Sequence, residues 1–383
     1  MKPLQIGLLG IGTVGRGTFE VLTRNQEEIQ RRAGRGIQIS MVADLDADRA
    51  RAIVGARAQV VTDARQVIAN PEIDIVIELI GGYGIAKQLV MEAIEAGKHV
   101  VTANKALLAV HGTEIFAAAR RKGVMVAFEA AVAGGIPIIK ALREGLTANR
   151  IQWLAGIING TTNFILSEMR DKGLDFDTVL KEAQRLGYAE TDPTFDIEGF
   201  DAAHKLTIMS AIAFGVPVQF DKAHVEGIST LQATDIKYAE QLGYRIKLLG
   251  ITRRRENGFE LRVHPSLVPS QRLIANVEGA MNAVMVQGDA VGTIRGKRAE
   301  LFAGIGIHNQ HAHPVRDKEA VAVGIARDEL LEALVAPRPR VDGLPGSEPV
   351  PCSRARTASS TLRTDHPSDA ARRANCSWNP RSV

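Results

Sequence analysis

Ile6-Gly-Leu-Leu-Gly-Ile-Gly-Thr-Val-Gly15 decides the fold of the first part of the chain, because it follows an apolar run and leads into Arg16 to Leu22, which has helical spacing. Its glycines form the pattern G-x-G-x-x-G between a predicted strand and a predicted helix. Gly10 permits the tight turn, Gly12 lets backbone N–H groups approach a pyrophosphate, and Gly15 lets the helix pack closely. The position of the pattern favours a dinucleotide-binding turn over an ordinary glycine-rich connection.

Short apolar runs alternate with longer amphipathic segments around this turn, which predicts βαβ units and a parallel sheet covered by helices on both faces. We therefore expect an α/β fold in which residues 1–134 form a Rossmann-type, doubly wound NAD(P)-binding domain. The predicted strands are Leu4 to Leu9, Ile37 to Val42, Ile73 to Leu79, Val100 to Thr102 and Val124 to Phe128.

The pattern changes beyond Gly134, where long helical stretches precede strand-like pieces. This change predicts a second, mixed α/β domain over residues 135–292. The expected helices are Asp177 to Leu186 and Ala202 to Phe214, and the expected strands are Ile246 to Thr252, Phe259 to His264 and Asn282 to Gln287.

The end of the second predicted strand is the place where a Rossmann unit usually distinguishes NAD from NADP. Asp44 or Asp46 could accept hydrogen bonds from the ribose hydroxyls of NAD and repel the extra phosphate of NADP. We expect a preference for NAD, although Arg49 and Arg51 are near enough in sequence to bind that phosphate. Plain surface acids are the alternative interpretation.

The composition is that of a folded protein without a membrane span. The chain has 383 residues, of which 45% are hydrophobic. No window approaches the roughly 18 uncharged apolar residues of a span, and the start shows no signal-peptide pattern, so a cytoplasmic location is expected. Cys352 and Cys376 are the two cysteines, which excludes a disulfide framework or a thiolate metal site in the body of the protein.

The net charge of +4 comes from the end of the chain. Residues 337–383 contain eight Arg, no Lys and four Asp or Glu, a balance of +4 that leaves the preceding residues neutral. A neutral body argues against a surface that binds nucleic acid.

Two lysines are candidates for chemistry. Lys105 follows a strand of the first domain, and the carboxyl ends of such strands face the ligand crevice. Lys205 is spaced i,i+4 from Asp201, which puts both side chains on one helical face. Solvated surface side chains are the alternative interpretation for both lysines.

Several blocks together resemble the homoserine dehydrogenase family, in its order and spacing, over about residues 1–292. The glycine turn is the least specific part, and the later blocks are far more specific. These blocks are Asn104-Lys105, Glu129 to Pro137, Asn159-Gly-Thr-Thr-Asn163, Leu186-Gly-Tyr-Ala-Glu-Thr-Asp-Pro193 and Asp201 to Lys205.

The resemblance implies roles for charged residues in reducing aspartate 4-semialdehyde to homoserine with NAD(P)H. Lys205 would protonate the aldehyde oxygen as hydride arrives, and Lys105 would be a second cation near nicotinamide and substrate. Glu190 and Asp201 would hold the ammonium group of this small-molecule substrate, with a backbone contact from Gly187.

The resemblance also implies binding residues for the cofactor and for an ion. A monovalent cation, usually sodium in the family, would be held mostly by backbone carbonyls of Glu129, Val132, Gly134 and Ile136, and a simple hinge without an ion is the alternative. The expected NAD(P) contacts are Gly10, Ile11, Gly12, Thr13, Val14, Gly15, Asp44, Thr102 and Lys105.

Three further expectations concern the second domain. Asn159 to Asn163 shapes the floor of the substrate pocket or forms a plain turn, and His204 is a structural neighbour of Lys205. Since the family often pairs through its substrate domain, residues 135–292 are expected to form a homodimer.

The resemblance ends after Gly288-Asp-Ala-Val-Gly292. We expect an uncertain helical segment at 293–336 and a disordered, Pro-, Ser- and Arg-rich tail at 337–383. A frameshift near codon 292 in GC-rich DNA would produce an amino-acid sequence of this composition, and translation of the other two reading frames tests this hypothesis. The unusual tail also leaves a non-catalytic, NAD(P)-sensing Rossmann protein as the alternative function.

Overall fold

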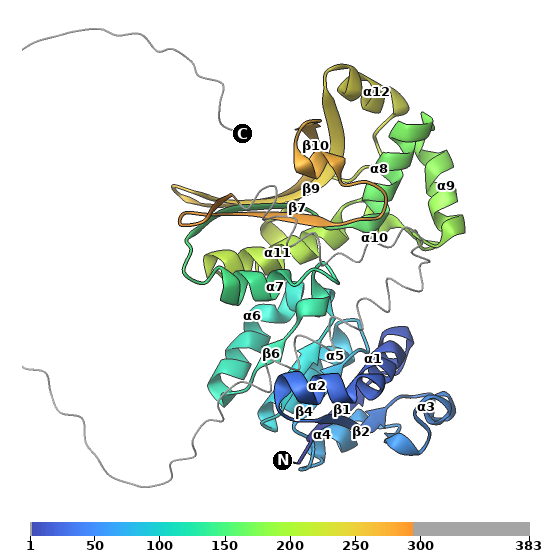
Figure 1. Cartoon of the computed structure of the whole chain (residues 1–383), viewed down its shortest axis with the longest axis vertical. Coiled ribbons are helices and arrows are strands. Elements are labelled where there is room, and N and C mark those ends of the chain that lie inside the picture. Colours follow the sequence, from blue (N-terminus) through green and yellow to red (C-terminus); the bar gives the residue numbers. More distant parts are fainter. Residues whose placement is uncertain (1, 294–383) are drawn as a thin grey trace, which may run out of the picture. The chain divides into compact units, whose positions relative to one another are not determined.

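The computed structural model describes residues 2–293, and the expectations for 294–383 lie outside the described residues. The first sheet, of which β1, β2, β4 and β6 are labelled in Figure 1, is parallel throughout, with the strand order β3-β2-β1-β4-β5-β6. Its strands are β1 (Leu4–Leu9), β2 (Ile37–Ala43), β3 (Gln59–Val61), β4 (Ile75–Glu78), β5 (His99–Thr102) and β6 (Val126–Ala127).

Helices fill the connections between these strands, as the alternating pattern predicts. Side chains such as Asp46 and Asn104 accept backbone N–H bonds at helix starts, and Gly34 and Gly123 end helices in the left-handed conformation. The helices are α1 (Thr13–Arg24), α2 (Gln26–Ala33), α3 (Ala47–Val54), α4 (Ala64–Ala69), α5 (Gly84–Glu95) and α6 (Lys105–Lys122).

Two separate cores show that the first sheet is covered on both faces. Neighbouring residues of β1 belong to different cores, because side chains alternate along a strand. Leu8 packs with Phe19 of α1, whereas Leu9 belongs to the core that contains Leu89 of α5 and Leu107 of α6. The expected doubly wound α/β fold is therefore confirmed.

The second sheet is mixed, with the order β12-β11-β7-β9-β10-β8. Adjacent strands in this sheet are antiparallel, except for β8 and β10, which are parallel. Its strands are β7 (Ile151–Ile157), β8 (His224–Val225), β9 (Tyr244–Arg255), β10 (Gly258–Pro269), β11 (Ala283–Gly288) and β12 (Gly292–Thr293).

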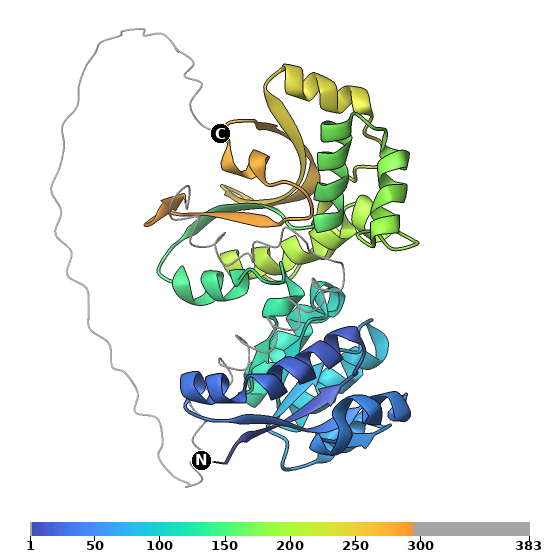
Figure 2. The same ribbon diagram turned by 45° about the vertical axis from the view of Figure 1, so that its right-hand side comes forward.

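Helix α11 (Phe200–Phe214) packs on one face of this sheet, and Figures 1 and 2 show it running beside the strands. Gly250 of β9 makes room for Ile158, which follows β7, because a Cβ there would lie 2.9 Å from the Ile158 side chain, whereas its distance of 3.4 Å to Leu206 of α11 would be an ordinary contact. The remaining helices of this part are α7 (Ile138–Lys140), α8 (Gly160–Lys172), α9 (Phe176–Leu186), α10 (Thr194–Ile197) and α12 (Ala233–Gln241).

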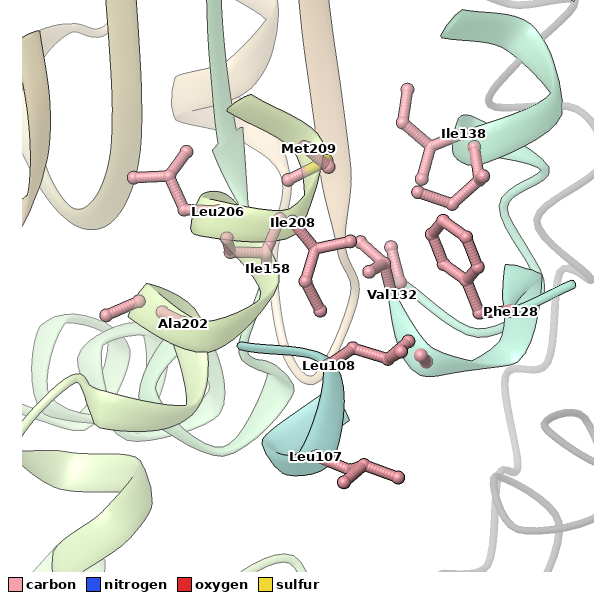
Figure 3. Close-up of a cluster of buried hydrophobic side chains, with 14 of the residues drawn as sticks. Leu107, Leu108, Phe128, Val132, Ile138, Ile158, Ala202, Leu206, Ile208 and Met209 are labelled. Atoms are coloured by element: carbon pink, nitrogen blue, oxygen red, sulfur yellow. The ribbon is translucent and has the colours of Figure 1, made fainter. Parts of the chain in front are cut away.

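One apolar core extends from α5 and α6 to α8, α11 and β7. Figure 3 shows the middle part of this core, where Leu108 of α6 and Ile208 of α11 converge with Val132, which lies between β6 and α7. The start of α6, which carries Lys105, is thus packed near the start of α11, which carries Asp201 and Lys205.

The sequence patterns did not predict β3, β7 or the two-residue strands β8 and β12. Strand β3 has three residues, too few to show a period. Strand β7 contains Gly156, which lowers strand propensity but permits close approach to β11, since a Cβ there would lie 2.7 Å from the carbonyl oxygen of Ala283.

Candidate active site

The glycine turn lies between β1 and α1 at the carboxyl edge of the parallel sheet. Gly10 has a φ of +89°, and a Cβ on it would lie 2.9 Å from the carbonyl oxygen of Leu79. A Cβ on Gly15 would lie 2.1 Å from the carbonyl oxygen of Gly10, whereas one on Gly12 would meet open space. Packing therefore requires glycine at 10 and 15, and the space at Gly12 suits a ligand that approaches the backbone.

Asp44 binds the glycine turn at the end of β2. Its Oδ2 accepts the backbone N–H of Ile11 at 2.8 Å. Its Oδ1 accepts the backbone N–H of Asp46 at 2.9 Å and the guanidinium of Arg49 at 3.0 Å. Burial would raise the pKa of Asp44, but these hydrogen bonds and the Arg49 charge bring the pKa below its ordinary value. Of the two nearby arginines, Arg49 contacts this acid, whereas Arg51 pairs with Asp48.

Asp201 joins the two candidate lysines. Its Oδ2 lies 2.7 Å from Nζ of Lys205, and its Oδ1 lies 3.0 Å from Nζ of Lys105. The Asp201 side chain is 4% exposed. Burial opposes ionisation, but the two lysine charges outweigh it and hold the pKa of Asp201 well below its ordinary range. The expected i,i+4 contact is present, and it extends to a lysine from another helix.

Ile158 and Asn159, which follow β7, also contact Lys205 and Asp201. Lys205 donates a second hydrogen bond to the carbonyl oxygen of Ile158, at 2.9 Å. Nδ2 of Asn159 donates to Oδ2 of Asp201 at 2.8 Å and to Oδ1 of Asp196 at 2.7 Å. Because Oδ1 of Asn159 also accepts the backbone N–H of Thr162, the same side chain caps α8.

Asp196 is a site residue that the sequence patterns missed. It lies on the short helix α10, and burial together with the nearby Asp201 charge raises its pKa. Its position three residues after Pro193, at the end of a specific motif, is the signal that could have drawn attention to it.

Comparison with known proteins matches both parts of the chain. The model "Homoserine dehydrogenase, NAD binding domain" matches residues 10–129, and the model "Homoserine dehydrogenase" matches residues 137–302. The homoserine dehydrogenase of Pseudomonas aeruginosa is 68% identical over 294 residues, which cover 76% of this chain and 67% of the relative. That of Neisseria gonorrhoeae is 64% identical over 292 residues, covering 76% of this chain and 67% of that relative.

The chain belongs to the homoserine dehydrogenase family. A solved homoserine dehydrogenase from Thiobacillus denitrificans has the same fold with a TM-score of 0.78 and 63% identity, and the match covers 87% of this chain and 74% of that one. The protein is therefore an NAD(P)-dependent oxidoreductase acting on a CH–OH group, which reduces aspartate 4-semialdehyde to homoserine. Membership of an enzyme family favours this function over a non-catalytic NAD(P) sensor.

Reduction of an aldehyde needs a proton donor, and the cluster formed by Lys105, Asp201 and Lys205 contains two ammonium groups and a carboxylate. Glu190 and Gly187 lie on an exposed turn after α9, and no contact described in residues 2–293 joins the Glu190 carboxylate to the two lysines. The turn is fastened by its backbone, since Tyr188 accepts a hydrogen bond from Thr161 through its carbonyl oxygen at 2.7 Å.

The loop expected to bind a cation has an unusual backbone. Ala133 is buried and has a φ of +49°, a conformation that disfavours residues other than glycine, and Gly135 has a φ of +86°. The Glu129 carboxylate accepts the backbone N–H groups of Ile139 and Lys140, each at 2.8 Å. Within residues 2–293 no three His, Cys, Asp or Glu side chains form a metal cluster, so an ion here would rely on carbonyls.

His204 packs in an aromatic contact beside Lys205. Its ring lies edge-on to Phe195 and Phe220, with centroids 5.1 Å and 4.3 Å away. Burial lowers the pKa of His204 to about 4, so the imidazole is neutral at neutral pH. This environment is that of a packed structural neighbour of Lys205, as predicted from the sequence.

In the described residues, no helix is long and apolar enough to cross a membrane.

Proposed function

We propose that Lys205 is the acid–base group of this homoserine dehydrogenase and that Lys105 is a second cation at the same site. One observation carries the proposal: the buried Asp201 carboxylate contacts Nζ of both lysines. A dinucleotide fits the turn at Gly10 to Gly15, where Gly12 faces open space at the start of α1. When bound there, it supplies or accepts the hydride.

The contacts of Lys205 suit proton transfer. A lysine ammonium has three protons, and two of them are donated to Asp201 and Ile158. The third has no partner among the described residues, and it would donate to the aldehyde oxygen as negative charge develops there. In the reverse direction the amine accepts the proton from the hydroxyl of homoserine.

The acids of the site would hold the ammonium group of the substrate. We assign this role to Glu190 and Asp201, with Gly187 offering a backbone contact, and add Asp196. The support for Asp196 is its half-buried carboxylate, which shares Asn159 with Asp201. A substrate ammonium would favour the ionised form of Asp196, whose pKa is raised.

The cofactor contacts remain assigned to Gly10, Ile11, Gly12, Thr13, Val14, Gly15, Asp44, Thr102 and Lys105. We propose a preference for NAD, because Asp44 is an acid at the ribose position. Its Arg49 partner, half exposed, is the cation that a 2′-phosphate would recruit. Michaelis constants for NADH and NADPH decide between the two cofactors, and Arg49→Ala should raise the NADPH constant alone.

We further propose a sodium ion bound by carbonyl oxygens of Glu129, Val132, Gly134 and Ile136. The support is the φ of +49° at Ala133, since strained backbone conformations of this kind cluster at functional sites. Activity in tetramethylammonium buffer should be low and should return on addition of Na⁺. Full activity without Na⁺ would favour the simple hinge.

We also propose domains at 1–134 and 135–292 and a homodimer in the cytoplasm. The second sheet has a suitable face for pairing. Gly250 and Thr252 point toward α11, so Leu249 and Ile251 point to the opposite face, together with Met285. Sedimentation analysis should give twice the chain mass, and Ile251→Asp should shift the protein to monomer.

The function itself is tested by a spectrophotometric assay of homoserine oxidation with NAD or NADP. Reduction of either nucleotide that requires homoserine is the expected result. Dinucleotide binding without turnover would indicate a sensor.

A further inference from the structure

Glu78 is a fully buried carboxylate at the carboxyl end of β4, the strand between β1 and β5. In the sheet register it is paired with Leu9, the last residue before the glycine turn, and with Thr102, the last residue of β5. The side chain therefore lies between the turn assigned to the dinucleotide and the turn that leads to Lys105.

Three neutral donors bind this carboxylate. Its Oε1 accepts the backbone N–H groups of Ile80 at 2.8 Å and Gly81 at 3.0 Å. Its Oε2 accepts the hydroxyl of Thr102 at 2.7 Å, and the oxygen of that hydroxyl accepts the backbone N–H of Asn104 at 3.0 Å. Every N–H or O–H group in this series of hydrogen bonds points toward Glu78. Position 78 therefore needs a side chain that only accepts hydrogen bonds.

The loop after β4 also contacts both the glycine turn and the turn between β5 and α6. A Cβ on Gly10 would lie 2.9 Å from the carbonyl oxygen of Leu79, so this loop closes on the glycine turn. The carbonyl oxygen of Gly82 accepts Nδ2 of Asn104 at 2.7 Å. Asn104 is also the N-cap of α6, whose first residue is Lys105.

We infer that Glu78 is a positioning residue: its carboxylate holds the loop after β4 and the turn before α6 as one unit, and so places Lys105 against the reacting groups. The inference rests on the role proposed above for Lys105. An amide at position 78 would direct an N–H group either at the backbone donors or at the Thr102 hydroxyl. One buried donor would then lose its acceptor, and the turn would shift to restore it. A displacement of about 1 Å at a catalytic group is enough to reduce turnover up to about a hundredfold.

A double-mutant cycle on the full chain tests this inference, with kcat for homoserine oxidation as the readout. Glu78→Gln should lower kcat by about tenfold or more, because Lys105 is displaced. In a Lys105→Met background the same change should lower kcat by less than about twofold, because the ammonium group that Glu78 positions is absent.

The matched control is Glu114→Gln, which makes the same carboxylate-to-amide change on α6. Glu114 is half exposed and pairs with Lys87 at 2.7 Å, so its kcat should stay within about twofold of the parent. If Glu78→Gln does not fold, Glu78→Asp keeps a carboxylate but shortens its reach to Thr102 and the loop after β4, and enters the cycle in its place.

The outcomes separate the inference from the proposal beneath it. Full kcat in Glu78→Gln, or an equal loss in both backgrounds, overturns the positioning role and leaves Lys105 untouched. Full kcat in Lys105→Met overturns the role of Lys105 itself, and the inference fails with it. A loss confined to the background that contains Lys105 supports both.

Discussion

Two lysines in the second part of the chain, Lys205 partly buried and Lys247 fully buried, have contrasting surroundings. Lys205 shares Asp201 with Lys105, which comes from the edge of the other sheet. Lys247 of β9 is 1% exposed, and its Nζ contacts Val277 and Asn163 oxygens at 2.6 and 3.0 Å and Glu278 at 3.5 Å. Burial lowers the pKa of Lys247.

The difference lies in what each ammonium has left to donate. All three protons of Lys247 can be given to its oxygen partners, and Glu278 is further paired with Arg170 and Arg245. Among residues 2–293, Lys205 has two protein partners for its three protons. A buried lysine with a complete set of partners stabilises the fold, and one with an incomplete set can act on a substrate.

The largest expected effect is on turnover in Lys205→Met. Loss of the proton donor should lower kcat by on the order of 10³-fold, while the dissociation constant of NAD(P)H changes little. Stopped-flow turnover and nucleotide fluorescence titration measure the two quantities. Unchanged kcat would contradict the assignment.

Lys247→Met is the matched change in the other cluster, and its effect should be on stability. Asn163 and Val277 would lose a buried donor, so the free energy of unfolding should fall by about 1–3 kcal/mol. Denaturant titration measures this loss, and kcat of the folded protein should stay near that of the parent. If kcat falls as far as in Lys205→Met, the contrast between the two lysines is wrong.

Asp196→Asn and Asp201→Asn should have opposite effects on stability. The pKa of Asp201 is lowered by folding, so its contribution is present above the unfolded pKa and is lost as the pH falls. The pKa of Asp196 is raised, so its ionised form costs stability above that pKa. At neutral pH, thermal denaturation should show a lower midpoint for Asp201→Asn and a slightly higher midpoint for Asp196→Asn. Shifts of the same sign would contradict this account.

The smallest expected effect concerns His204. Because folding lowers its pKa from 6.5 to about 4, the unfolded chain takes up a proton that the folded protein does not, and stability falls as the pH drops through this range. His204→Phe preserves an aromatic ring against Phe195 and Phe220 and should flatten that pH dependence. Parallel stability curves for the two proteins would show that another group titrates.

Local patterns explain what the sequence could predict. The glycine turn and the pairing of Asp201 with Lys205 depend on residues at most a few positions apart, and both are present in the structure. The motifs that resemble the family gave the function, which the comparisons support.

Contacts between distant segments explain what it could not predict. The approach of Lys105 to Asp201 depends on how α6 and α11 pack, and that of Asn159 to Asp196 depends on how α8 and α10 pack. No periodicity encodes that packing. The same holds for Glu78, whose position in a buried strand gives no sign that its carboxylate binds two loops.

The most direct test of the contrast between the lysines is a crystal structure of the protein with homoserine and an oxidised dinucleotide. We expect the hydroxyl oxygen of homoserine to lie within about 3 Å of Nζ of Lys205, with the adjacent carbon facing the nicotinamide bound beside Gly10 to Gly15. A hydroxyl group beyond hydrogen-bonding reach of Lys205 would contradict it.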